Sequence, residues 1–310
     1  MNTATEPWSR RDVWTRKLLY PGHTLPTALA PVVVASALAY HDGVFALLPA
    51  VLALLVGWLI QFAGVVMDNY QNLVDQPDDR EHPELVNAVA SGVLTLSGLR
   101  RTVLACYGLA LVMGVVLVFV SGWPVVAIGL AAITASYAYS AGPVPIGRVG
   151  LADPLFFVFF GMVSVVGTYY VEAASQGAVE AQALWRAFLV SVPVGALATS
   201  ILVIDDIRDR DFDRVKGKRT VAVRFGPRWS RVEYVALLAF AYAVPVGLWF
   251  TDAFHAWVLL PMLSVPFAVG IAQQVCVRDG YRELLPLTPR AAQLALGYAL
   301  LMAVGLTVSV

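Results

Sequence analysis

Charged residues are scarce in this chain of 310 residues. Asp, Glu, Lys and Arg make up 14% of it, whereas a typical soluble domain has about 25%. The 21 basic and 21 acidic residues cancel, so no positive excess is available for binding nucleic acid. Cysteine is also rare, and both Cys106 and Cys276 lie within apolar stretches. We therefore expect two buried thiols that act as small hydrophobic groups rather than a disulfide.

Hydrophobic residues make up 59% of the chain, and its mean hydropathy is +0.72. A soluble protein of this size has no means of burying so much apolar surface, so the bilayer is its natural solvent. The N-terminal segment carries Trp8, Arg10, Arg11, Asp12 and Arg16. No short apolar region with a small-residue cleavage site follows, so we expect no cleavable signal peptide.

A spanning helix needs about 20 consecutive apolar residues. The sequence predicts an all-α integral membrane protein with one domain over residues 24–310, preceded by a cytoplasmic segment, residues 1–23. Glycine and proline interrupt some spans, which membrane helices tolerate. The nine predicted spans are 24–41, 44–67, 98–120, 122–140, 152–173, 184–204, 231–250, 254–276 and 290–309.

The distribution of Lys and Arg predicts the orientation of these spans. With a cytoplasmic N-terminus, all of the 21 basic residues except Arg186 fall on the inner side, as the positive-inside rule requires. The expected location is the plasma (inner) membrane. Because the outer loops are short and poor in charge, we expect the chemistry in the two charged cytoplasmic loops that follow the second and sixth spans.

Both of these loops are rich in carboxylates. Positions i, i+4 and i+7 share one helical face, and Asp68, Asn72 and Asp75 have this spacing. Carboxylates gathered in this way favour Mg²⁺, which bridges a few of them to substrate phosphates. One acidic loop alone would be explained as ordinary solvated surface. Two acidic clusters on the same side of the membrane, both at helix ends, favour a shared metal site. The candidate metal ligands are Asp68, Asn72, Asp75, Asp78, Asp205, Asp206, Asp209 and Asp213.

Basic residues beside the second cluster complete a diphosphate site, because Lys and Arg bind phosphate oxygens through charge-assisted hydrogen bonds. Arg208, Arg214 and Lys218 are the candidates. Their simpler role is to set the topology. Asp211 is left out, because it faces away from Asp209 and Asp213 on a helix.

The second loop resembles the UbiA superfamily of intramembrane prenyltransferases. Asp209-x-x-x-Asp213 matches that family's D-x-x-x-D motif, and GKRTVAVRFG (217–226) is similar to the branch that prenylates 1,4-dihydroxy-2-naphthoate. Segments 23–39, 139–153 and 167–171 resemble the same branch. The first motif departs from the branch's N-D-Y-x-D, since it reads Asp68-Asn69-Tyr70-Gln71-Asn72. Asp205-Asp206 stands where the branch usually has two Asn, and Tyr20 replaces an Arg.

The resemblance implies a UbiA-type bundle with a central cavity, a Mg²⁺ cofactor, an isoprenyl diphosphate substrate and an aromatic acceptor. It also makes Asp68, Asn72, Asp209, Asp213 and Tyr139 the candidate catalytic residues and adds Arg148 as a diphosphate contact. Aromatic rings are expected to stabilise an allylic cation, and the candidates are Tyr70, Tyr137, Tyr139, Phe156, Phe160, Tyr169 and Tyr170.

Two other functions stay open from the sequence. The altered first motif also fits a UbiA-type terpene cyclase, in which the cation attacks the double bonds of its own chain and no acceptor is used. A transporter is disfavoured, because a substrate pathway would need ionisable residues deep inside the spans, where this sequence has almost none.

Overall fold

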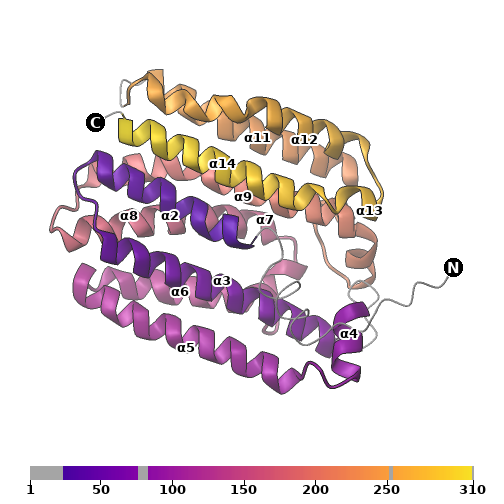
Figure 1. The fold of residues 1–310 in the computed structure, drawn as a ribbon. Helices are drawn as coiled ribbons and strands as arrows, with labels where there is room; N and C mark the ends of the chain where they lie inside the picture. Colours follow the sequence, from indigo (N-terminus) through magenta and orange to yellow (C-terminus); the bar gives the residue numbers. More distant parts are fainter. Residues whose placement is uncertain (1–23, 76–82, 251–253, 309–310) are drawn as a thin grey trace.

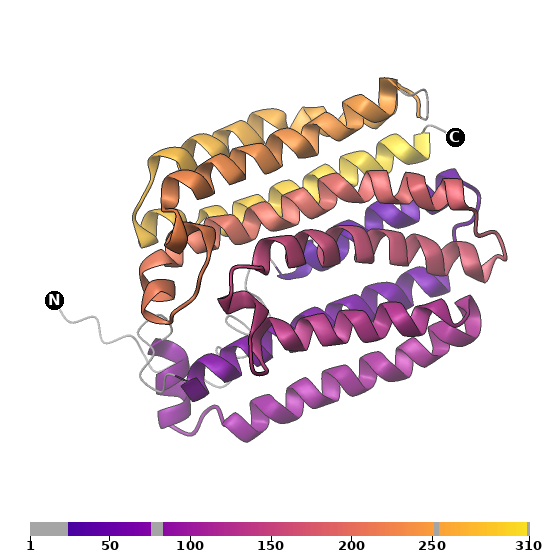
Figure 2. The ribbon, with the colours of Figure 1, turned by 180° about the vertical axis from the view of Figure 1, so that it is seen from behind.

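The computed structural model describes residues 24–75, 83–250 and 254–308, and within them every regular element is a helix. The long helices lie alongside one another in a single bundle (Figures 1 and 2). They are α2 (Thr24–His41), α3 (Leu47–Asp75), α5 (Leu96–Ser121), α6 (Pro124–Ser140), α7 (Ala152–Phe156) continued by η3 (Phe157–Val163) and α8 (Ser164–Ser175), α9 (Ala181–Val215), α11 (Pro227–Phe250), η4 (Ala256–Ser264) continued by α12 (Val265–Val277), and α14 (Leu287–Val308).

Within the part of the chain that the structure describes, four short helices connect them at the loops. They are α4 (Pro83–Ala90), η2 (Ile146–Arg148), α10 (Val221–Arg224) and α13 (Tyr281–Leu284). Among the described residues, seven helical segments are long and apolar enough to cross a membrane, and two apolar helices, Leu25–His41 and Pro124–Ser140, are shorter. The all-helical membrane fold is therefore confirmed, while the count of nine spans and the orientation stay predictions.

Two helices continue well beyond the predicted spans. The span predicted over 44–67 belongs to a helix that ends at Asp75, and the one over 184–204 belongs to a helix that ends at Val215. Hydropathy marks only the apolar part of a helix, whereas backbone hydrogen bonding continues into the polar turns. The carboxylates expected in loops consequently stand on the last turns of α3 and α9.

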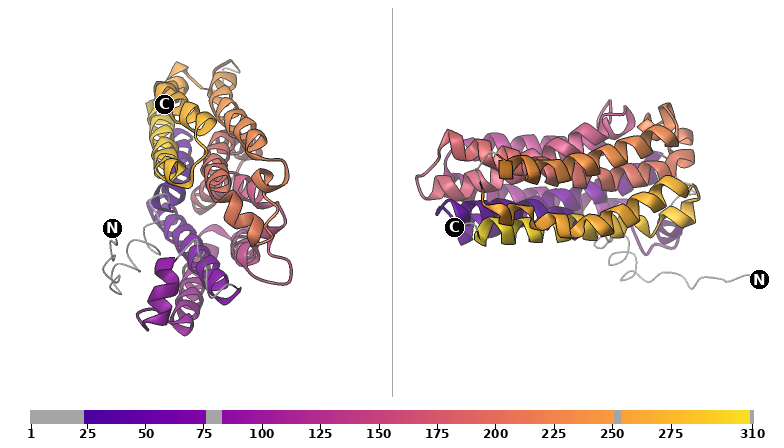
Figure 3. Two further views of the ribbon diagram at one scale, coloured as in Figure 1. Left: turned by 90° about the vertical axis from the view of Figure 1, so that its right-hand side faces the viewer. Right: turned by 90° about the horizontal axis from the view of Figure 1, so that it is seen from above.

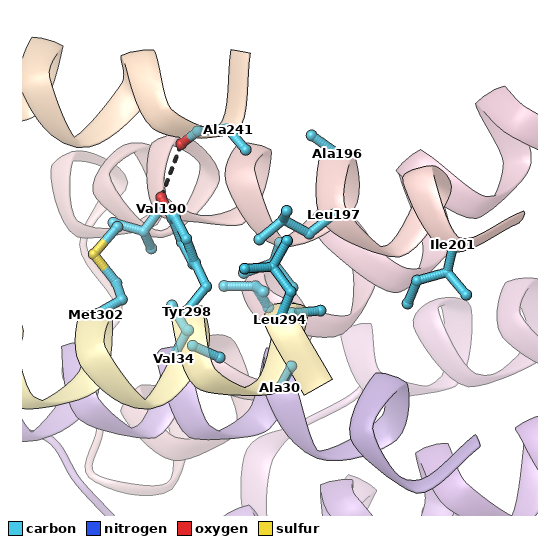
Figure 4. Close-up of a cluster of buried hydrophobic side chains, with 14 of the residues drawn as sticks. Ala30, Val34, Val190, Ala196, Leu197, Ile201, Ala241, Leu294, Tyr298 and Met302 are labelled. Atoms are coloured by element: carbon cyan, nitrogen blue, oxygen red, sulfur yellow. Dashed lines mark hydrogen bonds between the residues drawn. The ribbon is translucent and has the colours of Figure 1, made fainter. Parts of the chain in front are cut away.

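Helix α9 lies at the centre of the bundle. Of its most apolar stretch 83% is buried inside the protein, against 28% in α3 and α5. It packs against α11, η3 and α14, while α3 packs against α5 and α2 packs against α14. Figure 3 shows this arrangement down and across the bundle. The core around α9 is drawn in Figure 4, where the Tyr298 hydroxyl donates to the Ala241 carbonyl.

The segment before α8 is a π-helix, η3, whose wider turn changes the direction of its side chains. Its Gly161 faces Gly195 of α9 so closely that a Cβ added at Gly161 would lie 2.6 Å from the Gly195 Cα. Two glycines therefore let the backbones of η3 and α9 touch. This contact fixes the wall that η3 presents to the interior.

A polar network joins α2, α8 and α9 at one end of the bundle. Arg186 pairs with Asp42 at 2.8 Å, and the Tyr169 hydroxyl donates to Asp42 at 2.6 Å. Glu172 is fully buried and accepts from the Ser36 hydroxyl at 2.7 Å. These groups lie at the end opposite to the α3 and α9 carboxylates, so Tyr169 stands apart from the candidate site.

The two cysteines differ in their surroundings. Both are free; Cys106 is buried as expected, but Cys276 is exposed. The prediction of a buried thiol is wrong for Cys276, because an apolar stretch that faces lipid is as hydrophobic as one that faces the core.

Candidate active site

A cavity of about 610 Å³ lies between α3, α6, α7, η3 and α9. The last turns of α3 and α9 lie at the end of the bundle that carries α4 and α13 (Figure 1). One continuous face of α3 lines the cavity, because the lining residues recur with each helical turn, every three or four positions. From the inside of the bundle outward, these α3 residues are Gly57, Ile60, Gln61, Gly64, Val65, Asp68, Asn69 and Asn72. Helix α9 brings Asp205, Asp206, Asp209 and Asp213 to the same cavity. The two acidic clusters therefore share one space, as the sequence predicts.

Asp68 is held between α3 and α6. The Ser140 hydroxyl donates to its Oδ1 at 2.9 Å, and the Asn72 amide donates to its Oδ2 at 3.2 Å. Asn72 therefore orients Asp68 in addition to lining the cavity itself. The carboxylate is fixed in position and keeps further lone pairs for a ligand.

Arg208 joins the α9 carboxylates to α14. Its guanidinium forms an ion pair with Asp205 and donates to Asp209, with Nε 2.7 Å from Oδ1. Thr288 donates to Asp205 and accepts from Arg208 at 3.1 Å. The Tyr281 ring lies 5.7 Å from the guanidinium carbon, a cation–π distance. Arg208 therefore lines the cavity as a fixed positive charge.

Lys218 lines the cavity from the loop after α9. Its ammonium is 2.8 Å from Asp213 Oδ1, and its backbone N–H donates to the Asp213 carbonyl at 2.9 Å. Burial alone would lower the pKa of Lys218, but the carboxylates of Asp213 and Asp68 outweigh it and raise the pKa above its usual value. Lys218 therefore stays positively charged at neutral pH.

The loop that carries Lys218 is anchored by the segment after α6. The Arg219 N–H donates to the Arg148 carbonyl at 2.8 Å, and Gly150, at φ +84°, lies against Arg219. A Cβ on Gly150 would be 2.4 Å from the Arg219 carbonyl oxygen. Only glycine fits here, because the backbone is left-handed and the neighbouring atom is backbone.

We expect Gly150→Ala to lower kcat/KM about 10²-fold, since an ångström of displacement at Lys218 is enough to misplace a reacting group. Gly177→Ala is the matched control, because Gly177 also has a positive φ (+68°) but has no atom within 4 Å of an added Cβ. Steady-state kinetics of the two variants in parallel measures the difference. Equal activity of the two would contradict the anchoring role of Gly150.

Three of the predicted site residues, Asp75, Arg148 and Arg214, lie outside the lining of the cavity. Asp75 forms an ion pair with Arg148, and both side chains are more than a third exposed. Arg214 is 62% exposed and lies 4.0 Å from Asp211. Asp211 is itself 75% exposed, as its position on the helix predicts. Asp78 lies outside the described residues.

Aromatic side chains form part of the cavity wall. Tyr139, Phe156, Phe159 and Phe160 line it, and the Tyr139 and Phe156 rings are 5.7 Å apart. Of the other predicted aromatics, Tyr70 packs on the core between α3 and α5, Tyr137 is exposed, and Tyr170 bonds to the Ser121 carbonyl. Within the described part of the chain, these three do not line the cavity.

Sequence reasoning missed several polar lining residues. Tyr281 and Thr288 belong to no motif and reach the cavity only because α13 and α14 pack beside α9. Gln61 had a detectable signal, since it is a polar side chain in the middle of an apolar run. Thr27 and Ser136 also line the cavity.

The charges lining the cavity suit a divalent cation. Of the described residues, five carboxylates, Asp68, Asp205, Asp206, Asp209 and Asp213, line the cavity together with two cations, Arg208 and Lys218. Among the described residues no three carboxylate, imidazole or thiol groups are close enough to enclose a metal unaided. Mg²⁺ binds through one or two carboxylates, water and substrate phosphates, so the donor set fits Mg²⁺ bound together with a phosphorylated ligand.

Comparison with known proteins agrees with this chemistry. The model of the UbiA prenyltransferase family matches residues 28–284. The 1,4-dihydroxy-2-naphthoate octaprenyltransferase of Escherichia coli (strain K12) is 30% identical over 316 residues, covering 97% of each chain.

Two solved structures share the fold. The apo structure of a UbiA homolog from Aeropyrum pernix K1 superposes with a TM-score of 0.67 at 17% identity, covering 92% of this chain and 97% of that one. A UbiA homolog from Archaeoglobus fulgidus bound to DMAPP and Mg²⁺ gives 0.56 at 17% identity, covering 93% and 99%. The chain therefore belongs to the UbiA prenyltransferase family and is a membrane prenyltransferase.

Proposed function

We propose that this enzyme transfers an isoprenyl group from an isoprenyl diphosphate to an aromatic acceptor of the 1,4-dihydroxy-2-naphthoate type and releases diphosphate, at the cytoplasmic face of the plasma membrane. The observation that carries the proposal is the single cavity lined by carboxylates of both α3 and α9. The similar protein from Escherichia coli, a 1,4-dihydroxy-2-naphthoate octaprenyltransferase, supports the acceptor class. The Archaeoglobus fulgidus homolog, bound to DMAPP and Mg²⁺, supports the donor and the metal.

Asp68, Asn72, Asp209 and Asp213, together with Asp206, are the residues that would hold Mg²⁺ with the diphosphate. The bound metal supplies positive charge for the departing diphosphate. Lys218 and Arg208 are already positioned and charged, so each adds hydrogen bonds to phosphate oxygens without first being ordered. Arg148 and Arg214 are more than a third exposed and stand outside the cavity lining, where they would meet the diphosphate only as it enters.

The allylic carbon left behind reacts as a carbocation-like electrophile, and its lifetime depends on the exclusion of water. The rings of Tyr139, Phe156 and Phe160 lie in the cavity wall and offer π-faces to that positive charge. A nucleophilic ring carbon of the acceptor then forms the new bond to the allylic carbon. The ring carbon then loses its proton to the released diphosphate or, where it carries the carboxylate, loses this group as carbon dioxide, which restores aromaticity.

The volume of the cavity limits what it holds. A cavity of about 610 Å³ lies within the range of about 300–1,000 Å³ that is usual for sites enclosing one drug-sized ligand. A long polyprenyl diphosphate together with an acceptor is much larger than such a ligand. We therefore expect the far end of a long tail to lie in lipid while the diphosphate and the first isoprene units occupy the cavity.

A product assay with a panel of isoprenyl diphosphates, each with and without dihydroxynaphthoate, tests the proposal. We expect diphosphate release and a prenylated aromatic product only when acceptor and Mg²⁺ are both present. The aromatic wall of Tyr139, Phe156, Phe159 and Phe160 also favours the alternative, a terpene cyclase. A cyclic hydrocarbon or alcohol formed without acceptor would replace transfer by cyclisation.

A further inference from the structure

A second group of polar side chains lines the cavity, deeper in the bundle than the carboxylates. Gln61 precedes Asp68 by seven residues on the same face of α3, which places it two turns, or about 10 Å, deeper. Thr27 of α2 and Ser136 of α6 also line the cavity. A polar amide at this depth is unusual in a membrane protein and marks a functional site by default.

Ser136 is accounted for by packing. Its hydroxyl donates to the Ile60 carbonyl at 3.1 Å and accepts from Tyr107 at 2.9 Å, and its Oγ would touch a Cβ on Gly64. These contacts join α6 to α3 and α5. Ser136 therefore has a structural role and is not needed to explain a ligand.

Gln61 is not accounted for in this way. Its amide nitrogen donates to Thr27 Oγ at 2.6 Å, but its Oε1 is buried and accepts no hydrogen bond from the residues that the structure describes. A buried acceptor without a donor costs free energy, and an apolar side chain would fill the position without that cost. The Gln61 side chain also lines the cavity, so a rotation of its amide would present this acceptor atom to a hydroxyl group that enters there.

We propose that Gln61, held by Thr27, binds a ring hydroxyl of the aromatic acceptor. This inference rests on the proposed function and assigns the subsite of its second substrate. The prenyl donor has no polar group other than the diphosphate, which the carboxylates bind about 10 Å away. Its tail matches the apolar wall of Leu155, Phe156, Phe159, Phe160 and Val163. A hydroxylated aromatic ring lying between Gln61 and Asp68 brings its reacting carbon beside the allylic carbon.

Gln61→Leu is the first test, assayed with dihydroxynaphthoate and with an analogue that lacks one ring hydroxyl. We expect KM for the dihydroxy acceptor to rise about 10- to 100-fold, because a hydroxyl then enters a site without its partner. KM for the isoprenyl diphosphate should change less than twofold, which also shows that the variant is folded. Discrimination between the two acceptors should shrink to about twofold. Gln273→Leu, at an exposed position on α12 outside the cavity lining, should match the wild type.

Thr27→Val is the second test, because it leaves Gln61 in place but removes the group that orients it. We expect a rise of about tenfold in acceptor KM with unchanged donor KM. If wild-type enzyme transfers the prenyl group but Gln61→Leu keeps its acceptor KM and its discrimination between the acceptors, the inference is wrong. If the wild type prenylates no aromatic acceptor at all, the proposed function itself is wrong, so the two failures are distinct.

Discussion

Replacement of Asp213 by alanine is expected to lower kcat/KM for prenyl transfer by about 10³-fold, a loss of about 4 kcal/mol of transition-state stabilisation. Asp213 is almost fully buried and pairs with Lys218. Its removal takes away a candidate metal ligand and leaves a partly buried ammonium without its nearest counter-charge. Asp209→Ala should fall in the same range, since Asp209 lines the same cavity and positions Arg208.

Asp211→Ala is the matched control for both variants. Asp211 stands between the two on the same helix but is 75% exposed and points away from the cavity lining. Kinetics in detergent or nanodiscs at saturating Mg²⁺ should show activity within about twofold of the wild type for this variant. Full Mg²⁺-dependent turnover by Asp209→Ala and Asp213→Ala would remove the basis of the metal site.

Replacement of Gly161 by valine is expected to destabilise the protein by about 3 kcal/mol. A Cβ there would lie 2.6 Å from the Gly195 Cα and 3.0 Å from the Ser191 carbonyl oxygen. Both neighbours are backbone atoms, so the helices themselves have to separate. We expect a lower thermal unfolding midpoint in detergent, with loss of the wall that η3 presents to the substrate.

Gly114→Val provides the comparison for this prediction. Gly114 lies within α5, and a Cβ added there would meet no atom within 4 Å. The substitution carries the same change in helix propensity without the contact, so we expect little change in unfolding temperature. Similar midpoints for the two variants would mean that the approach of η3 to α9 contributes little to stability.

The helices and the shared acidic cavity were predictable from the sequence. Apolar runs of about 20 residues marked the helices, and the i, i+4, i+7 spacing put Asp68 and Asn72 on one face. The same spacing failed for Asp75, which lies at the last residue of α3 and pairs with Arg148 instead. Spacing determines the face of a helix, but it does not determine where along the helix the cavity ends.

Contacts between segments that are distant in the sequence could not be predicted from it. The pairing of Gly161 with Gly195 depends on how η3 packs against α9, and neither glycine differs by sequence from the open Gly57 or Gly114. Thr288 reaches Asp205 only through the packing of α14 beside α9. Such residues carry no local pattern, because their roles are set by tertiary neighbours.

Binding of a non-hydrolysable isoprenyl thiodiphosphate analogue to purified enzyme, measured by calorimetry with and without Mg²⁺, tests whether α3 and α9 together form one site for metal and diphosphate. We expect binding that requires Mg²⁺ and that is lost in Asp68→Ala on α3 and in Asp213→Ala on α9 alike, while Asp211→Ala binds normally. Metal-independent binding, or unchanged Mg²⁺-dependent affinity in either of the first two variants, would contradict this shared site.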